Sequence, residues 1–431
     1  MTYQQTLNYL YDRLPMFSKI GAAAYKADLH NTIALCNAIG NPQQKIKTIH
    51  IAGTNGKGST AHMLAAILQC AGYKTGLYTS PHIKDFRERI KVNGQMILEQ
   101  AVIDFVKKTK NITAEISPSF FELTVAMAFD YFENQNCDIV VVETGLGGLL
   151  DSTNIITPIL SIITNIGYDH QNILGNTLQE IAMQKAGIIK QNVPVVIGDT
   201  LPETKQIFID IANSKNADLF FANELFTPSG IAYEGNVLVV DVHNVMTCKT
   251  EKYKLGLIGL YQSKNICTVL ESVEQLKNIG INITNTALSQ GLQEVKKITG
   301  LQGRWEILQQ NPTIILDVAH NKDGIGQVLY QLETEYSYSN LHFILGFVKD
   351  KDVAETLKLF PKNAKYYFTN AHIARAMPVN DLKQIALLAG LDGDAFDNVN
   401  DALANAKVNV ATNDVIMICG SFFVIGEIDN I

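Results

Sequence analysis

The most constraining feature of this 431-residue chain is a regular alternation of apolar runs with helical patterns. The apolar runs are short and rich in β-branched residues, which is typical of strands buried on both faces; they span 46–52, 137–144, 159–166 and 193–198. Between them, apolar residues recur at three- and four-residue spacing, which predicts helices at 59–72, 121–135 and 178–189. Strands that alternate with helices predict right-handed crossovers and a mostly parallel sheet, whose ligand-binding residues follow the carboxyl ends of the strands.

The alternation also predicts where one domain ends and another begins. It weakens at 222–255, where the pattern resembles hairpins, and it returns after the loop at 298–302. A second set of apolar runs then predicts strands at 313–318, 341–347, 365–371 and 414–420. Because common domains contain roughly 100 to 200 residues, two domains are expected. We place them at 1–298 and 299–431, the second being a smaller, Rossmann-like α/β domain.

Composition excludes several classes of protein. Hydrophobic residues make up 47% and charged residues 18%, which is enough apolar surface for buried sheets and too little charge for an extensively disordered chain. The net charge of −7 argues against a nucleic-acid partner. The six cysteines are scattered without a CxxC pair, so we expect reduced thiols. No stretch approaches the roughly 18 apolar residues of a membrane span, and no signal peptide pattern opens the chain, so a cytoplasmic protein without a membrane partner is expected. A monomer is expected as well, although no sequence feature carries that expectation.

A glycine-rich segment joins the first predicted strand directly to the first predicted helix. It consists of Gly53, Thr54, Asn55, Gly56, Lys57, Gly58 and Ser59. Glycines let backbone N–H groups turn toward phosphates, the helix N-terminus adds its dipole, and a lysine neutralises charge. Ser59 is placed to approach Mg²⁺. The segment therefore predicts a P-loop that binds ATP in the first domain, although Gly58 separates Lys57 from Ser59 and departs from the usual spacing.

Further motifs make a specific resemblance visible. After GTNGKGS at 53–59, the chain reads YTSPHI at 78–83, SFFE at 119–122, ETGLGGLLDSTN at 143–154, KAGI at 185–188 and DVAHN at 317–321. In this order the segments resemble the folylpolyglutamate synthase and dihydrofolate synthase family of the Mur-type ligase superfamily. The resemblance implies an enzyme of folate biosynthesis and one-carbon metabolism. It would use ATP and Mg²⁺ to activate a pterin or folate carboxylate as an acyl phosphate, join it to L-glutamate, and release ADP and phosphate.

The resemblance also assigns catalytic and metal-binding residues. Glu143 ends one predicted strand and His170 follows another, where a carboxylate and an imidazole suit a divalent cation. By similarity, Ser80, Glu143 and His170 are the Mg²⁺ ligands, and Lys185 is carbamylated so that it offers an oxygen ligand. With Lys57 these residues form the implied catalytic set. His50, His62 and His82 are read as structural residues.

The other implied contacts lie at the nucleotide and at the acid substrate, for which the family's acids are dihydropteroate or a reduced folate. By resemblance, Arg304 would contact the phosphates, Asp317 and His320 would contact the nucleotide, and Asn265 would lie on the adenine side. Each of three residues also has a structural alternative. These are a salt bridge for Arg304, a cap at the strand end for Asp317 and a helix cap for Asn265. Residues of both domains on one ATP imply closure that excludes water. The acid-side residues implied by similarity are Ser119, Phe120, Phe121, Glu122, Leu150, Asp151 and Ser152. The two phenylalanines suit either stacking on a heterocycle or the core.

Two positions depart from the family pattern, and three alternatives stay open. Leu149 stands where the family commonly has arginine, and Gln184 stands where it often has glutamate. A peptidoglycan-type Mur ligase usually carries a further domain before the phosphate loop, for which the 52 residues before Gly53 are too few. A P-loop kinase or nucleotide switch does not explain Lys185. A non-catalytic ATP-binding paralogue is motivated by Leu149 and Gln184.

Overall fold

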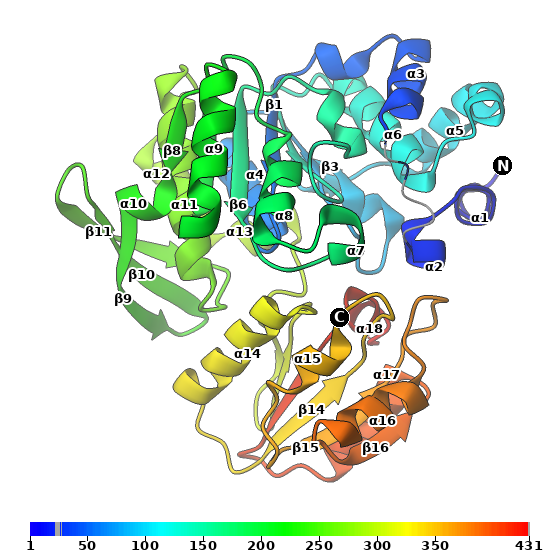
Figure 1. The fold of residues 1–431 in the computed structure, drawn as a ribbon, viewed down its shortest axis with the longest axis vertical. Coiled ribbons are helices and arrows are strands. Elements are labelled where there is room, and N and C mark those ends of the chain that lie inside the picture. The colour runs from blue at the N-terminus through cyan, green and yellow to red at the C-terminus, as the bar shows by residue number, and fades with distance from the viewer. Residues whose placement is uncertain (22–25, 27, 430–431) are drawn as a thin grey trace. The chain divides into compact units, whose positions relative to one another are not determined.

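The computed structural model describes residues 1–21, 26 and 28–429. Contacts divide the chain into two compact units. The first comprises Met1–Gly167, Gln171–Leu257 and Tyr261–Leu301, and the second comprises Tyr168–His170, Ile258–Leu260 and Gln302–Ile431. Each unit has its own mostly parallel sheet (Figure 1).

The first unit is built on a large, mostly parallel sheet with the strand order β4-β3-β2-β5-β1-β6-β7-β8. Its strands are β1 (Thr48–Ala52), β2 (Thr75–Tyr78), β3 (Ile90–Val92), β4 (Gln95–Met96), β5 (Ile139–Glu143), β6 (Leu160–Asn165), β7 (Val195–Asp199) and β8 (Leu219–Phe221). The central strands β1, β2 and β5 are buried along their whole length. The apolar runs at 46–52 and 137–144 predict this for β1 and β5, whereas β2 was not predicted. Among the described residues of this sheet, the antiparallel pairs are β2 with β3 and β3 with β4, at one edge.

Helices cover this sheet and lie between its strands in the chain, as the alternation predicts (Figure 1). They are α1 (Tyr3–Arg13), α2 (Phe17–Ile20), α3 (His30–Ala38), α4 (Lys57–Cys70), α5 (Glu99–Ile116), α6 (Phe120–Asn134), α7 (Gln171–Leu174), α8 (Leu178–Ala186), α9 (Pro202–Ser214), α10 (Ala222–Leu225), α11 (Gln262–Asn278), α12 (Asn285–Gln293) and α13 (Val295–Thr299). Short 3-10 turns are η2 (Pro42–Gln44), η3 (Phe86–Arg89) and η4 (Ser152–Ile155). Helix α4 is almost fully buried, so the segment after the glycine-rich loop is fixed in the core.

The segment predicted to form hairpins is an antiparallel sheet with the order β11-β10-β9. Its strands are β9 (Phe226–Glu234), β10 (Val237–Asn244) and β11 (Lys249–Leu255). This sheet is separate from the parallel sheet of the first unit. Figure 1 shows it at one side of that unit. The hairpin prediction is therefore correct.

The second unit is a smaller α/β structure with the strand order β12-β13-β17-β14-β15-β16. Its strands are β12 (Glu306–Gln309), β13 (Thr313–Leu316), β14 (Leu341–Leu345), β15 (Lys365–Thr369), β16 (Gly393–Phe396) and β17 (Val415–Cys419). Its helices are α14 (Lys322–Glu335), α15 (Val353–Leu357), α16 (Val379–Leu388), α17 (Val399–Val408) and α18 (Phe422–Gly426). All pairs are parallel except β12 with β13. The expected α/β class holds for both units.

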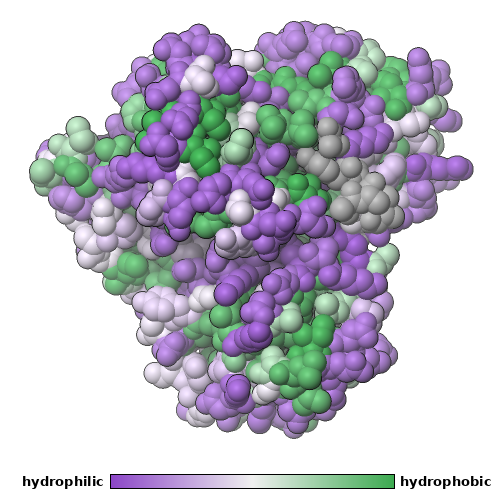
Figure 2. All heavy atoms as spheres, in the orientation of Figure 1, coloured by the Kyte–Doolittle hydropathy of each residue, from purple (hydrophilic) through white to green (hydrophobic). Residues whose placement is uncertain are grey.

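Three further features concern the molecular surface, the length of the helices and the state of the cysteines. The face in Figure 2 is largely hydrophilic, with scattered hydrophobic areas. No helix formed by the described residues is long and apolar enough to cross a membrane. The six cysteines, all of which belong to the described part of the chain, are free thiols.

Candidate active site

The glycine-rich loop lies where a phosphate-binding loop is expected. Strand β1 ends at Ala52, and α4 begins at Lys57 with Gly56 as its N-cap residue in a left-handed conformation. The φ angles of Gly53 and Gly56 are 149° and 83°, which side chains rarely tolerate. A Cβ on Gly53 would lie 1.8 Å from Thr164 Oγ1, and one on Gly56 would lie 2.5 Å from Asn265 Oδ1. Both glycines are therefore required by the path of the loop.

The end of β6 holds this loop from the side. The Asn165 Oδ1 atom accepts hydrogen bonds from Asn55 N at 2.8 Å and Thr54 N at 3.2 Å, and Thr164 Oγ1 donates to Asn55 O at 2.6 Å. The Thr54 hydroxyl exchanges two hydrogen bonds with Gly167, donating to its carbonyl and accepting from its N–H. The sequence reasoning did not identify these supports, although their position at a strand end near a P-loop is a usable signal.

Two lysines meet at one carbonyl of the loop. The Lys57 Nζ atom donates to Gly53 O at 3.1 Å and to Thr54 O at 3.2 Å. The Lys185 Nζ atom, which comes from α8, donates to the same Gly53 O at 2.8 Å, and Lys185 is only 4% exposed. The structure thus brings together two cationic residues that the sequence analysis singled out separately.

A chain of amide hydrogen bonds joins the loop to α11. Asn265 Nδ2 donates to Gln262 Oε1 at 2.8 Å, and Gln262 Nε2 donates to Ser59 Oγ at 3.1 Å. Asn265 therefore lies directly against the phosphate loop through Gly56. Its predicted role on the adenine side stays a prediction, and Gln262 is a further residue of this site that the sequence did not suggest.

Glu143 is a buried acidic residue at the end of a strand that pairs with β1. It ends β5 in register with Ile51 of β1, two residues before Gly53. Its side chain is buried, and its Oε2 atom accepts a hydrogen bond from Ser80 N at 3.2 Å. The structure therefore places Ser80 beside Glu143.

The first acid-side segment, 119–122, begins helix α6. Ser119 and Glu122 form a capping box, in which each side chain accepts a hydrogen bond from the other residue's backbone N–H. Phe120 is 3% exposed and belongs to the core. Phe121 is only partly buried, its ring is 6.2 Å from that of Tyr78, and a Cβ on Gly145 would lie 2.4 Å from its Cζ. Phe121 is thus the one of the two rings that adjoins the loop following β5.

The second acid-side segment, 150–152, is part of a tightly bonded loop. Asp151 Oδ2 accepts from Leu146 N at 2.7 Å, and Asp151 Oδ1 accepts from Thr153 N at 3.0 Å. Burial raises the pKa of Asp151, and these hydrogen bonds oppose the shift. The residue is 3% exposed, so its observed role is to shape the loop and cap η4 at Ser152. Its contact with a pterin ring, like that of Leu150 and Ser152, stays a prediction.

The two positions that depart from the family pattern are neighbours in space. Leu149 N donates to Gln184 O at 2.7 Å, and Leu149 O accepts from Asn154 Nδ2 at 2.9 Å. The Leu149 side chain is exposed. The backbone of the loop is therefore held without an arginine at this position.

In the second unit, Asp317 organises the loop that carries Arg304. Asp317 follows β13, and its carboxylate accepts from Trp305 N and from Ala319 N, both at 2.8 Å. The Arg304 guanidinium lies 5.2 Å from the centre of the Phe422 ring, and the His320 ring lies 5.7 Å from that of Phe422. These three predicted nucleotide contacts are therefore close together in one unit.

His170 also belongs to the second unit, in a cluster of charged and polar side chains. Asp169 forms ion pairs with Lys351 and, at 3.5 Å, with His320, and the Lys351 Nζ atom lies 3.3 Å from His170 Nε2. Burial raises the pKa of Asp169, but the ion pair with Lys351 and the hydrogen bond from His320 oppose it, and that pKa lies well below its usual range. Burial lowers the pKa of His170 to about 3, so its ring is neutral, as metal binding requires. Lys351 gave no signal in the sequence analysis.

The histidines read as structural have structural partners. His50 Nε2 is 2.8 Å from Thr153 Oγ1, and His62 Nδ1 is 2.8 Å from Thr299 Oγ1. His82 Nδ1 accepts a hydrogen bond from Arg89 Nε at 2.7 Å.

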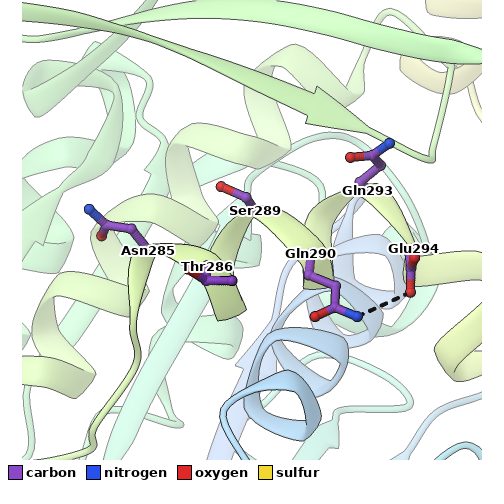
Figure 3. A pocket seen from close by; sticks show the side chains of 6 residues that line it. All are labelled: Asn285, Thr286, Ser289, Gln290, Gln293 and Glu294. Carbon is purple, nitrogen blue, oxygen red and sulfur yellow. Dashed lines mark hydrogen bonds between the residues drawn. The ribbon is translucent and has the colours of Figure 1, made fainter.

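A separate surface hollow lies along α12 and contains none of the predicted residues (Figure 3). Its lining is polar and mostly uncharged, with a hydrogen bond between Gln290 and Glu294. The lining residues are Asn285, Thr286, Ser289, Gln290, Gln293 and Glu294. The chemistry-bearing groups of the first unit are instead gathered around Gly53.

Comparison with known proteins identifies the family. The Mur ligase middle domain matches residues 51–273, and the Mur ligase glutamate ligase domain matches residues 303–422. The dihydrofolate synthase/folylpolyglutamate synthase of Bacillus subtilis is 32% identical over 442 aligned residues, which cover 99% of this chain and 98% of that protein. This chain belongs to the dihydrofolate synthase/folylpolyglutamate synthase family. The resemblance seen in the motifs is therefore confirmed.

Solved structures of this family have the same fold. Escherichia coli FolC, in complex with DHPP and ADP, aligns with a TM-score of 0.84 at 26% identity, over 99% of this chain and 96% of that chain. The folylpolyglutamate synthase of Mycobacterium tuberculosis, complexed with ADP and AMPPCP, aligns with a TM-score of 0.84 at 28% identity, over 98% and 97% of the two chains. The expected α/β class, with a mostly parallel sheet followed by a smaller sheet domain, is confirmed.

Proposed function

We propose that this chain is an ATP-dependent ligase that adds L-glutamate to the carboxylate of dihydropteroate and of a reduced folate. The carboxylate would take the γ-phosphoryl group of ATP to form an acyl phosphate, and the glutamate amine would then displace phosphate, so that ADP and phosphate are released. The observation that carries the proposal is the arrangement at Gly53. A glycine loop, two lysines and a buried glutamate lie together at the carboxyl end of a parallel sheet, in a member of this ligase family.

The residues of the loop have defined tasks in this reaction. The backbone N–H groups of the loop and the first turn of α4 bind phosphate oxygens, because they open a helix N-terminus. Lys57 exchanges its carbonyl acceptors for a phosphate oxygen and disperses the charge of the transferring group. Asn165 and Gln262 keep the loop in shape while this happens. Catalysis of this kind depends mainly on positioning and electrostatic stabilisation.

The residues near Glu143 fit a magnesium ion shared with the nucleotide. Among the residues that the structure describes, no three His, Cys, Asp or Glu side chains cluster as metal ligands. Mg²⁺ suits such a site, because it prefers a few carboxylate or hydroxyl oxygens together with substrate phosphates. We propose Glu143 and Ser80 as donors, with Lys185 as a further donor after carbamylation; His170 stays proposed as a metal ligand on the resemblance alone. When bound, Mg²⁺ neutralises charge on the phosphate oxygens.

The remaining assignments concern the nucleotide and the acid. Arg304, Asp317 and His320 are proposed for the nucleotide, and their proximity to one another supports a shared ligand. Phe121 is the best candidate for stacking on the pterin ring, because its side chain is only partly buried and adjoins Gly145. We further propose that the protein acts as a monomer, without a nucleic-acid partner.

The direct test is an ADP-release assay with ATP, Mg²⁺, L-glutamate and one acid at a time. We expect glutamate-dependent ADP release with dihydropteroate and with a reduced monoglutamyl folate, and a product whose mass has increased by one glutamyl residue. Lys57→Met serves as the inactive control. Release with only one acid would reject the double specificity. A folded protein that binds ATP but ligates neither acid would be a non-catalytic paralogue, and the proposal would be wrong.

A further inference from the structure

Arg89 is a buried cation that no carboxylate neutralises. It ends η3, is 8% exposed, and donates from Nε to His82 Nδ1. Its guanidinium lies 5.4 Å from the centre of the Phe120 ring. Within the described part of the chain it forms no ion pair, and residues 22–25 and 27, which lie outside that part, are alanines and a tyrosine. The adjacent carboxylate, that of Glu88, is occupied by three backbone N–H groups of the preceding turn.

A second buried polar group lies beside this guanidinium. Tyr78 ends β2 and is 1% exposed, and its buried hydroxyl has Arg89 as its hydrogen-bonding neighbour. The Tyr78 ring lies 6.2 Å from the ring of Phe121, and the Arg89 guanidinium lies over the ring of Phe120. Two groups that can donate hydrogen bonds to an anion therefore adjoin the first acid-side segment, through Phe120 and Phe121.

The nearby Arg87, in contrast, pairs with carboxylates, as arginines in proteins commonly do. Arg87 donates to both oxygens of Asp85, with Nη2 to Oδ2 at 2.7 Å, and lies 3.4 Å from Glu99. A buried charge is costly unless a counter-ion or a ligand neutralises it. Arg87 has its counter-ions in the protein, whereas the Arg89 guanidinium contacts the neutral groups of His82, Tyr78 and Phe120.

We propose that Arg89 and the Tyr78 hydroxyl bind the non-reacting α-carboxylate of a glutamyl-bearing acid substrate. This inference rests on the proposed function. The planar guanidinium fork matches a carboxylate in a bidentate manner. The reacting carboxylate is a poor partner for such a fork, because an ion pair that is stronger in the ground state than in the transition state slows the reaction. The α-carboxylate of an attached glutamate does not react and keeps its charge throughout.

The assignment makes Arg89 a specificity-determining residue. Dihydropteroate has a single carboxylate, which is the one that reacts, so it has no group for Arg89 to hold. A reduced folate that already carries glutamate has the additional α-carboxylate. Arg89 is therefore required for the extension of a folate and not for the first addition to dihydropteroate.

The test compares Arg89→Gln with Arg87→Gln as the matched control. In Arg89→Gln we expect the KM for a reduced monoglutamyl folate to rise by about tenfold or more, as the loss of a charge-assisted pair implies. The KM for ATP should be unchanged, and the KM for dihydropteroate should rise by less than about threefold. Arg87→Gln should leave the ratio of the two acids unchanged. Tyr78→Phe should shift that ratio in the same direction as Arg89→Gln.

A binding cycle isolates the contact itself. The fluorescence of the ligand reports the affinity for the monoglutamyl folate and for its α-carboxamide, which lacks the charge. The amide should bind the parent about tenfold more weakly than the acid, and this difference should vanish in Arg89→Gln. If Arg89→Gln does not fold, the same binding measurements are made with Arg89→Lys. The difference in affinity between the acid and its α-carboxamide should then be smaller than in the parent, because lysine lacks the planar fork of arginine.

The outcomes separate this inference from the proposed function. The role of Arg89 alone would be overturned if the parent is active and the Arg89 variants are impaired equally with both acids. It would also be overturned if the difference in affinity between the acid and its amide is the same in the variants as in the parent. A parent that ligates neither acid would overturn the function on which the inference rests.

Discussion

The side-chain ammonium groups of Lys57 and Lys185 donate hydrogen bonds to the same oxygen, the carbonyl of Gly53, at 3.1 Å and 2.8 Å. Two cations that share an acceptor repel one another. Conversion of Lys185 to an anionic carbamate would replace this repulsion by attraction to Lys57 or to a metal ion. The geometry thus gives a physical reason for the modification that the KAGI motif implies.

Replacement of Lys185 by alanine tests that modification. Lys185→Ala should lower turnover by about a hundredfold or more, because a metal-binding oxygen is lost. A small carboxylic acid added to the buffer should restore part of the activity. Lys190→Ala is the matched control, since Lys190 Nζ donates only to Asn154 O. Full turnover of Lys185→Ala in CO₂-free buffer would contradict the carbamate.

Neutralisation of Glu143 tests the metal assignment. In Glu143→Gln, kcat should fall by about tenfold to a hundredfold, whereas the Kd for ATP should change less, because Lys57 and the loop still bind the phosphates. Higher Mg²⁺ should recover part of kcat. Glu133→Gln, which removes a surface partner of Lys45, should behave like the parent. Equal sensitivity of the two variants to Mg²⁺ would show that Glu143 is not a ligand.

A methyl group at Gly56 should damage nucleotide binding specifically. Gly56 has a φ of 83°, and its Cβ would lie 2.5 Å from Asn265 Oδ1. Gly56→Ala should therefore weaken ATP binding by about tenfold or more through distortion of the loop. Gly72→Ala, which follows the other end of α4 with a φ of 91° and open space around the Cβ, controls for backbone strain. Similar ATP affinities in the two variants would refute the steric argument.

The buried His50 should make stability depend on pH. Burial lowers its pKa to about 3 from the ordinary value of 6.5, with Lys190 adding to the shift. Between these pH values the unfolded chain binds the additional proton, so folded stability is lost as the pH falls below 6.5. At pH 5 the loss from one such group is roughly 2 kcal/mol.

The measurement for His50 is a denaturant titration at pH 5 and pH 7. The difference between the two pH values should shrink in His50→Gln relative to the parent. His30→Gln removes an exposed histidine and should leave the difference unchanged. An identical pH dependence in parent and His50→Gln would contradict the prediction.

The sequence predicted the central strands well because burial on both faces leaves a continuous apolar run. The run at 137–144 corresponds to β5, and the run at 414–420 corresponds to β17. Edge strands were missed for the opposite reason. Strands β4 and β8 are short and only partly buried or exposed, so their composition does not distinguish them from loops.

The candidate site was predictable where a motif lies within one segment and not where it is completed by distant residues. Residues 53–59, which lie between a predicted strand and a predicted helix, are enough to predict a phosphate-binding loop. Asn165 and Gln262 support this loop from elements more than 100 positions away, and an isolated Asn or Gln carries no signal of such a contact. The same holds for Lys351, whose partner Asp169 is 182 positions distant.

The main-chain hydrogen bonds that hold residue 149 have an evolutionary consequence. Because Leu149 N and O are engaged by Gln184 and Asn154 while the side chain is exposed, the shape of the loop does not depend on which side chain stands there. A mutation at this codon can add or remove a positive charge without remodelling the backbone. Charge at the loop can therefore vary independently of the fold.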